Sequence, residues 1–259
     1  CGGPPLPELL GFPTWKAFYQ SELQSVWAVV LVPACFLLWA LWAGRLRGPG
    51  TEAEAAFVRR YALFFGVLTV LDPVCTGPFT RWLGLGEAAG TAVMLGFVLL
   101  GDFRVFLLLF GLRAGGAWRG PAARQAGLWT LAVPAFAWPV HQGLTIFDPA
   151  LPSQTLWLVY EAAFMGLALT LRRGLSRDEA FAGRPVLRAY LRRVLAYVAV
   201  YYGLWALSDA LVLGAGLDAG WALRVFPNQL YYALFVPFVY LSFFSARSAP
   251  RRSAVQAAR

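Results

Sequence analysis

The residues that could do chemistry in this 259-residue chain are polar side chains set inside long apolar stretches. Seven candidates stand out: Asp72, Asp102, Arg104, His141, Glu161, Asp209 and Asn228. Ionisable groups are costly inside a membrane, so each one is by default a candidate for function. Grouped carboxylates could hold a cation, and His141, the only histidine, could exchange protons with them. We therefore expect an acidic cavity that binds or transports a small solute, a cation or protons.

The depth of each candidate follows from a rise of about 1.5 Å per residue along its helix. Asp102 falls near the middle of its stretch and Arg104 slightly deeper. Two residues apart is about 200° around a helix, so these two cannot pair with each other. For Arg104 we expect a carboxylate partner from another helix, either Asp72, Glu161 or Asp209. The other five candidates fall in the outer half: Asp72, His141, Glu161, Asp209 and Asn228.

The alternative interpretation is that these groups form interhelical hydrogen bonds and salt bridges that fix the packing. Several known chemistries are excluded. The only lysine, Lys16, precedes the bundle, which excludes covalent retinal, and one histidine cannot supply a zinc or bis-histidine haem site. Nucleotide-binding and hydrolase motifs are absent, so no cofactor is expected. A Mg²⁺ or Ca²⁺ site made only of Asp72, Glu161 and Asp209 stays open.

The elements that must position these residues are membrane helices. The chain is 59% hydrophobic and only 14% charged, against about 25% charged in a typical soluble domain. A bilayer core of about 30 Å needs about 20 apolar residues per helix. We predict an all-α integral membrane bundle of seven transmembrane helices, at roughly 25–44, 59–79, 90–112, 126–147, 154–171, 190–214 and 228–246.

Basic residues predict the orientation of this bundle, because they are concentrated on the cytoplasmic side of membrane proteins. Of the 22 basic residues, 18 lie in the connections after the first, third and fifth spans or in the C-terminal tail. Only Lys16, Arg81 and Arg224 fall on the opposite side. We therefore expect the N-terminus outside and the C-terminus in the cytoplasm. The net charge of +9 then reflects topology and contact with anionic lipids, not nucleic-acid binding.

The chain divides into residues 1–24, an extracytoplasmic leader with an interfacial segment at 14–24, the transmembrane domain 25–247 and a basic cytoplasmic tail 248–259. It begins with Cys1-Gly2-Gly3, which resembles the mature end of a bacterial lipoprotein, whose signal peptide is cut before a lipid-bearing cysteine. This resemblance implies that Cys1 is a lipidation site in a multi-pass protein of a bacterial inner membrane. The alternative is that Cys1 merely marks where the given sequence starts.

Two segments share a pattern that indicates an internal repeat. Phe64-Phe65-Gly66 is followed by Asp72, and Tyr201-Tyr202-Gly203 is followed by Asp209, with the same interval from glycine to aspartate. Both helices run in the same direction, which suits a 3+1+3 arrangement of parallel repeats. Prolines in 72–78 predict that span two breaks there, and Pro227 predicts the start of span seven.

Two other functions stay open. The many aromatic residues and the absence of an active-site motif favour a non-catalytic subunit with a membrane-protein partner. A lipid-modifying enzyme of the outer leaflet would use His141 as base, oriented by Glu161 or Asp72. The test that separates these interpretations is whether the polar side chains share one cavity.

Overall fold

The computed structural model describes residues 8, 11–42, 50–118 and 120–245, and these residues form helices without a strand. The predicted lipidation site Cys1 and the predicted tail 248–259 lie outside the described residues. The elements are α2 (Trp15–Gln20), η1 (Leu23–Trp27), α3 (Ala28–Trp42), α4 (Glu52–Val74), η2 (Cys75–Phe79), α5 (Thr80–Trp82), α6 (Glu87–Arg113), α7 (Pro121–Phe147), α8 (Gln154–Gly174), η3 (Glu179–Phe181), α9 (Pro185–Ala215), α10 (Ala219–Asn228), η4 (Gln229–Leu234) and α11 (Phe235–Ser245).

Five helical stretches are long and apolar enough to cross a membrane, which supports a multi-pass membrane protein. They are Leu23–Trp42, Glu52–Trp82, Glu87–Arg113, Gln154–Gly174 and Pro185–Ala215. The other two predicted spans are helical as well, in α7 and in η4 with α11, but do not belong to these five. The all-helical membrane class is thus confirmed, whereas the seven-span count is not.

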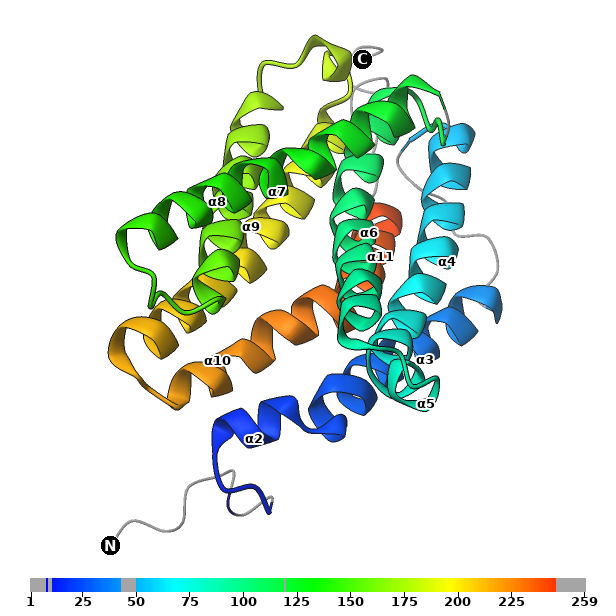
Figure 1. Ribbon diagram of the computed structural model, residues 1–259. Coiled ribbons are helices and arrows are strands. Elements are labelled where there is room, and N and C mark those ends of the chain that lie inside the picture. The colour runs from blue at the N-terminus through cyan, green and yellow to red at the C-terminus, as the bar shows by residue number, and fades with distance from the viewer. Residues whose placement is uncertain (1–7, 9–10, 43–49, 119, 246–259) are drawn as a thin grey trace, which may run out of the picture.

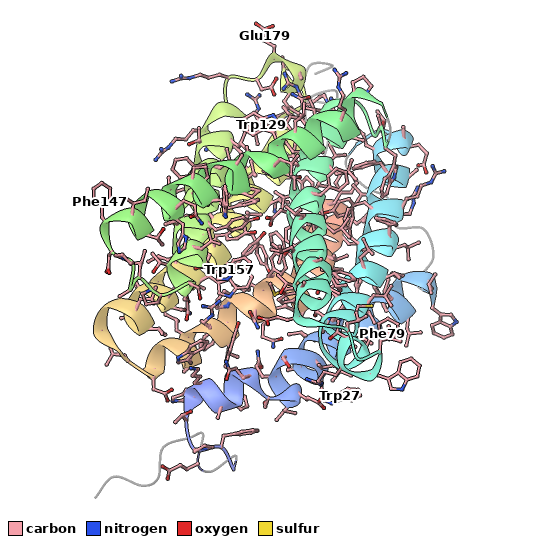
Figure 2. All side chains as sticks on the ribbon, in the orientation of Figure 1. Trp27, Phe79, Trp129, Phe147, Trp157 and Glu179 are labelled. Atoms are coloured by element: carbon pink, nitrogen blue, oxygen red, sulfur yellow. The ribbon has the colours of Figure 1, made fainter. Side chains whose placement is uncertain are left out.

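The helices form two groups that meet around the centre of the molecule (Figure 1). One group contains α3, α4, α6 and α11, and the other contains α8 and α9, which α7 crosses obliquely. Helices α2 and α10 lie together across one end. Large apolar side chains such as Trp27, Phe79 and Phe147 are exposed on the outside, as expected for a surface that faces hydrocarbon (Figure 2).

The end opposite α2 is fixed by local sequence signals and one ion pair. Thr51 and Glu54 form a reciprocal capping box that starts α4. Glu54 also pairs with Arg184, which donates to the carbonyl of Leu112 at 3.1 Å. Since these residues belong to α4, the start of α9 and the end of α6, the contacts tie three long helices together at this end.

The interfacial segment predicted at 14–24 contains a short helix that packs on α10. Thr14 caps α2 by accepting from the backbone N–H of Ala17. The carboxylate of Asp218, just before α10, accepts from the backbone N–H groups of Trp15 and Lys16 at 2.7 and 3.1 Å. These contacts hold α2 beside α10, where Tyr19 of α2 reaches the interior.

Both predicted helix breaks are wrong. The segment 72–78 continues from α4 into the π-helix η2, and Pro227 lies inside α10, which runs directly into the π-helix η4. A proline removes one backbone donor and crowds the preceding turn. In both places the chain stays helical through the proline and enters a π turn two residues later. Both helices therefore continue past their prolines.

Candidate binding site

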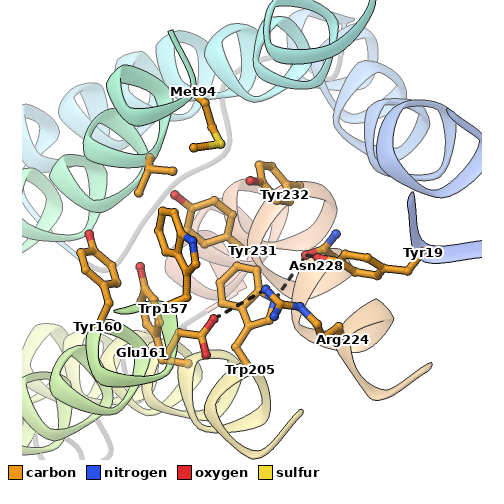
Figure 3. A pocket seen from close by; sticks show the side chains of 12 residues that line it. Tyr19, Met94, Trp157, Tyr160, Glu161, Trp205, Arg224, Asn228, Tyr231 and Tyr232 are labelled. Carbon is orange, nitrogen blue, oxygen red and sulfur yellow. Dashed lines mark hydrogen bonds and ion pairs between the residues drawn. The ribbon is translucent and has the colours of Figure 1, made fainter. Parts of the chain in front are cut away.

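A cavity of about 270 Å³ lies where the two helix groups meet the α2–α10 end. Six elements contribute to its wall, namely α2, α6, α8, α9, α10 and η4. Seven of the twelve lining side chains are aromatic (Figure 3). The lining residues are Tyr19, Met94, Val98, Trp157, Tyr160, Glu161, Tyr202, Trp205, Arg224, Asn228, Tyr231 and Tyr232.

The π-helix η4 supplies two adjacent aromatic side chains to this wall, Tyr231 and Tyr232. Tyr231 packs against Trp205 of α9, with ring centroids 5.2 Å apart. Its hydroxyl group approaches Gly101 of α6 so closely that a Cβ at position 101 would overlap it. Glycine at this position therefore allows the ring of Tyr231 to reach the cavity wall.

Arg224 of α10 lies at the centre of the polar side of the cavity. It donates through Nη1 to Oδ1 of Asp209, and its Nη2 lies 3.8 Å from Oε1 of Glu161. Gln154 Nε2 donates to the same Asp209 oxygen at 3.1 Å. Both carboxylates are buried, and Oε2 of Glu161 and Oδ2 of Asp209 have no hydrogen-bond partner within the described chain. One guanidinium thus faces two carboxyl groups, so the group has one more acidic than basic side chain.

Aromatic and amide groups surround the guanidinium on its other side. Arg224 lies over the rings of Tyr19 and Trp221, at 5.5 and 5.6 Å from their centroids. Asn228 Oδ1 accepts from the Tyr19 hydroxyl at 3.1 Å and from Trp205 Nε1 at 3.3 Å. These contacts link α2, α9 and α10 and hold the aromatic wall in place.

Asp102 lies behind the wall rather than in it. Its side chain is fully buried, and its two oxygens accept from the hydroxyl groups of Tyr160 and Tyr202, which do line the cavity. Both carboxylate oxygens are therefore hydrogen-bonded by α8 and α9. Asp102 closes the deep side of the cavity by anchoring these two rings.

The prediction that Arg104 pairs with a carboxylate is wrong. Arg104 donates to Thr69 Oγ1 at 3.3 Å and to the main-chain carbonyl of Tyr231 at 2.7 Å, and it forms no ion pair with any described residue. It also lies over the rings of Tyr231 and Phe235, at 4.2 and 4.4 Å from their centroids. Carbonyl oxygens and aromatic faces both carry partial negative charge, so they can replace a carboxylate.

Asp72 and Arg104 share a separate, much smaller cavity of about 10 Å³ on the far side of Tyr231. This volume is enough for roughly one water molecule. Tyr231 contributes to both cavities, so its side chain is the partition between them. Asp72 therefore lies apart from Glu161 and Asp209.

His141 lies apart from the other candidates. It is buried in α7, it does not line the cavity, and neither of its ring nitrogens has a hydrogen-bond partner in the described part of the chain. The hydrogen bond to Glu161 or Asp72 that would orient His141 as the base of a lipid-modifying enzyme is not formed. Among the described residues, no three His, Cys, Asp or Glu side chains are grouped to hold a metal ion. The suggested Asp72, Glu161 and Asp209 metal site is therefore not assembled.

The structure thus brings together only part of the predicted set. Glu161 and Asn228 line the cavity, Asp209 reaches it through Arg224, and Asp102 reaches it through two tyrosines. Sequence reasoning missed Arg224 and the aromatic residues. Spacing could have found them, because side chains four positions apart share a helix face. The pairs with this spacing are Trp157 with Glu161, Trp205 with Asp209, and Arg224 with Asn228.

Comparison with protein-family models, with curated proteins and with solved structures finds no match. The chemistry of the cavity is therefore the guide to function. Aromatic faces attract cations, and the cluster of Glu161, Asp209 and Arg224 has one more acidic than basic side chain. The arrangement can hold a compact cation against ring faces while a carboxylate oxygen accepts its hydrogen bonds or balances its charge.

Proposed function

We propose that this protein binds a small organic cation in the aromatic cavity and carries it across the membrane. The observation that supports this most is Glu161. Its side chain is 4% exposed, it lines a wall of seven aromatic residues, and its Oε2 has no partner within the described chain. A buried carboxyl oxygen without a hydrogen-bond partner is costly, and a cation bound beside it would reduce this cost.

The size and composition of the cavity favour an organic cation over other ligands. Its volume of about 270 Å³ is just below the roughly 300–1,000 Å³ of typical ligand pockets, so the ligand must be small. A hard metal ion prefers six or more oxygen ligands, which an aromatic wall does not offer. An anion would meet two carboxylates and a single guanidinium that is already paired.

Transport is supported by the position of the cavity within the proposed seven-span bundle. The 27 residues of α7 extend roughly 40 Å at about 1.5 Å per residue, which is enough to cross a bilayer as a tilted helix. The cavity lies toward the α2–α10 end, which the basic residues predict to be outside. Beneath it, Asp102 with its two tyrosines and Arg104 with Tyr231 form the layer that would act as the deeper gate.

The proposed 3+1+3 repeat gains support from two glycines. A Cβ at Gly66 of α4 would lie 2.6 Å from Leu37 of α3, and one at Gly203 of α9 would lie 2.9 Å from Met165 of α8. In both cases the glycine allows the helix to approach the helix that precedes it in the chain. We propose that α3–α6 and α8–α11 are related units with α7 between them.

The test of binding is isothermal titration calorimetry with tetramethylammonium on the full chain in lipid nanodiscs. We expect Glu161→Gln to weaken binding at least tenfold, roughly 1.4 kcal/mol, because the charge that faces the ligand is removed while the shape is kept. Glu22→Gln is the matched control, since Glu22 is an exposed carboxylate on the same end of the molecule, paired with Arg81. It should leave the affinity unchanged.

Two results would contradict the proposal. One is equal affinity of wild type and Glu161→Gln for tetramethylammonium. The other is that the wild-type protein binds neutral tert-butanol as tightly as it binds tetramethylammonium. This comparison tests whether the ligand's charge matters and needs no substitution in the protein. Counterflow of labelled tetramethylammonium in proteoliposomes tests transport separately, and binding without flux would leave only the binding function.

A further inference from the structure

The aromatic cavity adjoins a second cavity of different chemistry. This apolar pocket, of about 390 Å³, lies between α6, α7 and α8. Three residues line both spaces, namely Val98, Trp157 and Tyr160. The polar end of Tyr160 points to Asp102, so the apolar pocket meets mainly the ring face. The two cavities are therefore neighbours that share one wall.

The apolar pocket in turn adjoins a third space along the same pair of helices. A further apolar pocket of about 610 Å³ lies between α6 and α7, and it shares Leu99 and Leu131 with the first one. The three spaces follow one another through shared lining residues, as a row from the charged group around Glu161 to a pocket lined mainly by apolar side chains together with Thr130 and Arg124. Polarity thus falls from the aromatic cavity to the apolar pocket beside it, whose lining contains no charged residue.

The apolar part of this row is open toward the outside of the bundle. Leu131 is 53% exposed and Trp138 is 60% exposed, although both line the apolar pocket. In a membrane protein such side chains face lipid hydrocarbon. The apolar part of the row therefore lies between the charged cavity and the outer surface of the bundle at α6 and α7.

From this gradient we infer that the bound cation is an amphiphile, an alkylammonium whose charged head occupies the aromatic cavity and whose single alkyl chain lies in the apolar pocket between α6, α7 and α8. This inference rests on the proposed function and names its ligand class. The head is held by Glu161 and the ring faces, whereas the chain contacts Val98, Leu99 and Leu131. The alkyl chain would stay in apolar surroundings while the ammonium head is carried across the membrane. Transport of the head therefore does not expose the alkyl chain to water.

Photo-crosslinking in nanodiscs with two dodecylammonium probes tests this arrangement on the full chain. One probe carries a diazirine beside the nitrogen and the other carries it at the chain end. We expect the first to label α8 around Trp157, and the second to label α6 and α7 around Leu99 and Leu131. Excess tetramethylammonium should reduce both signals, and dodecanol with the same labels should give neither.

The outcomes separate the inference from the function on which it rests. A head label at Trp157 with the chain-end label elsewhere overturns the inference and leaves the proposed function standing. Calorimetric binding of tetramethylammonium without any head label at the cavity also overturns the inference alone. The proposed function itself fails when tetramethylammonium does not bind, when Glu161→Gln binds it as tightly as wild type does, or when tert-butanol binds as tightly as the cation.

A pair of substitutions on α7 gives a second readout. Leu131→Trp narrows the apolar pocket, whereas Leu144→Trp places the same side chain at another exposed position of α7 outside these pockets. We expect Leu131→Trp to weaken dodecylammonium binding about tenfold, equivalent to roughly two methylene groups, and to leave tetramethylammonium binding unchanged. Leu144→Trp should change neither. Equal loss for both ligands in Leu131→Trp, or no loss for either, would overturn the inference.

Discussion

Arg224 balances two carboxylates that reach it from different helices. Glu161 comes from α8, Asp209 from α9, and Arg224 itself from α10, and all three side chains are largely buried. Removing one partner from a buried ion pair is far more costly than replacing the whole pair, because an uncompensated charge remains. Arg224 therefore links α8, α9 and α10 and also determines the charge of the group that a ligand would meet.

We expect Arg224→Leu to lower the free energy of unfolding by about 3 kcal/mol, since it leaves two buried carboxylates facing each other without a cation. Adding Asp209→Asn should recover part of this loss, because it removes one of the two charges. Thermal unfolding of the four variants in a double-mutant cycle measures the effect. Additive changes across the cycle would contradict the direct interaction between Arg224 and Asp209.

At the residue scale, the sequence pointed to polar side chains that are buried in the structure but did not identify their partners. Asp102, Glu161 and Asp209 are recognisable because charge in an apolar stretch is rare and costly. Their partners depend on the direction in which each side chain points around its helix and on which helices lie beside it. The estimated depth in the membrane predicts neither the direction nor the neighbours. Arg104 illustrates this, since its partners are a hydroxyl, a main-chain carbonyl and two rings.

At the scale of elements, the site depends on the close approach of α6 and the π-helix η4. A regular α-helix has 3.6 residues per turn, so its successive side chains point about 100° apart. The π turn is wider and changes these directions locally. Tyr231 then passes beside Gly101 and separates the larger cavity from the small one at Asp72. The backbone and the glycine together determine where the aromatic wall stands.

Gly101→Ala should therefore weaken tetramethylammonium binding and lower the free energy of unfolding by about 1–3 kcal/mol, the usual range for overpacking. Its Cβ would overlap the Tyr231 hydroxyl, and Tyr231 is itself packed against Trp205. Gly90→Ala is the control on the same helix, because a Cβ at position 90 meets no atom within 4 Å. If the two variants behave alike in calorimetry and thermal unfolding, Gly101 does not position the wall.

Element boundaries were only partly predictable from sequence. Long apolar runs identified the helices well, because the bilayer forces backbone groups to bond within each segment. Prolines were a weaker guide, since Pro73 and Pro227 lie inside helices that continue as π turns. A proline indicates where a helix is strained, but whether the helix ends there depends on the packing around it.

At the scale of the whole molecule, the feature with the largest consequence is whether α7 crosses the membrane. If it does, the residues before and after it lie on opposite sides of the membrane, as the distribution of basic residues predicts. If it does not, the helices after it are inverted relative to the predicted orientation. The apolar row between α6 and α7 faces lipid only when α7 lies within the bilayer.

Cysteine accessibility resolves this point. In a background with Cys1, Cys35 and Cys75 replaced by serine, we expect Ala150→Cys, after α7, to react with a membrane-impermeant maleimide in intact right-side-out vesicles. Ala114→Cys, before α7, should react only after permeabilisation. Both positions are exposed on the protein surface, so unequal labelling reflects the membrane and not burial. Reaction of both from the same side would show that α7 does not span, and would remove the seven-span arrangement and the lateral opening that depends on it.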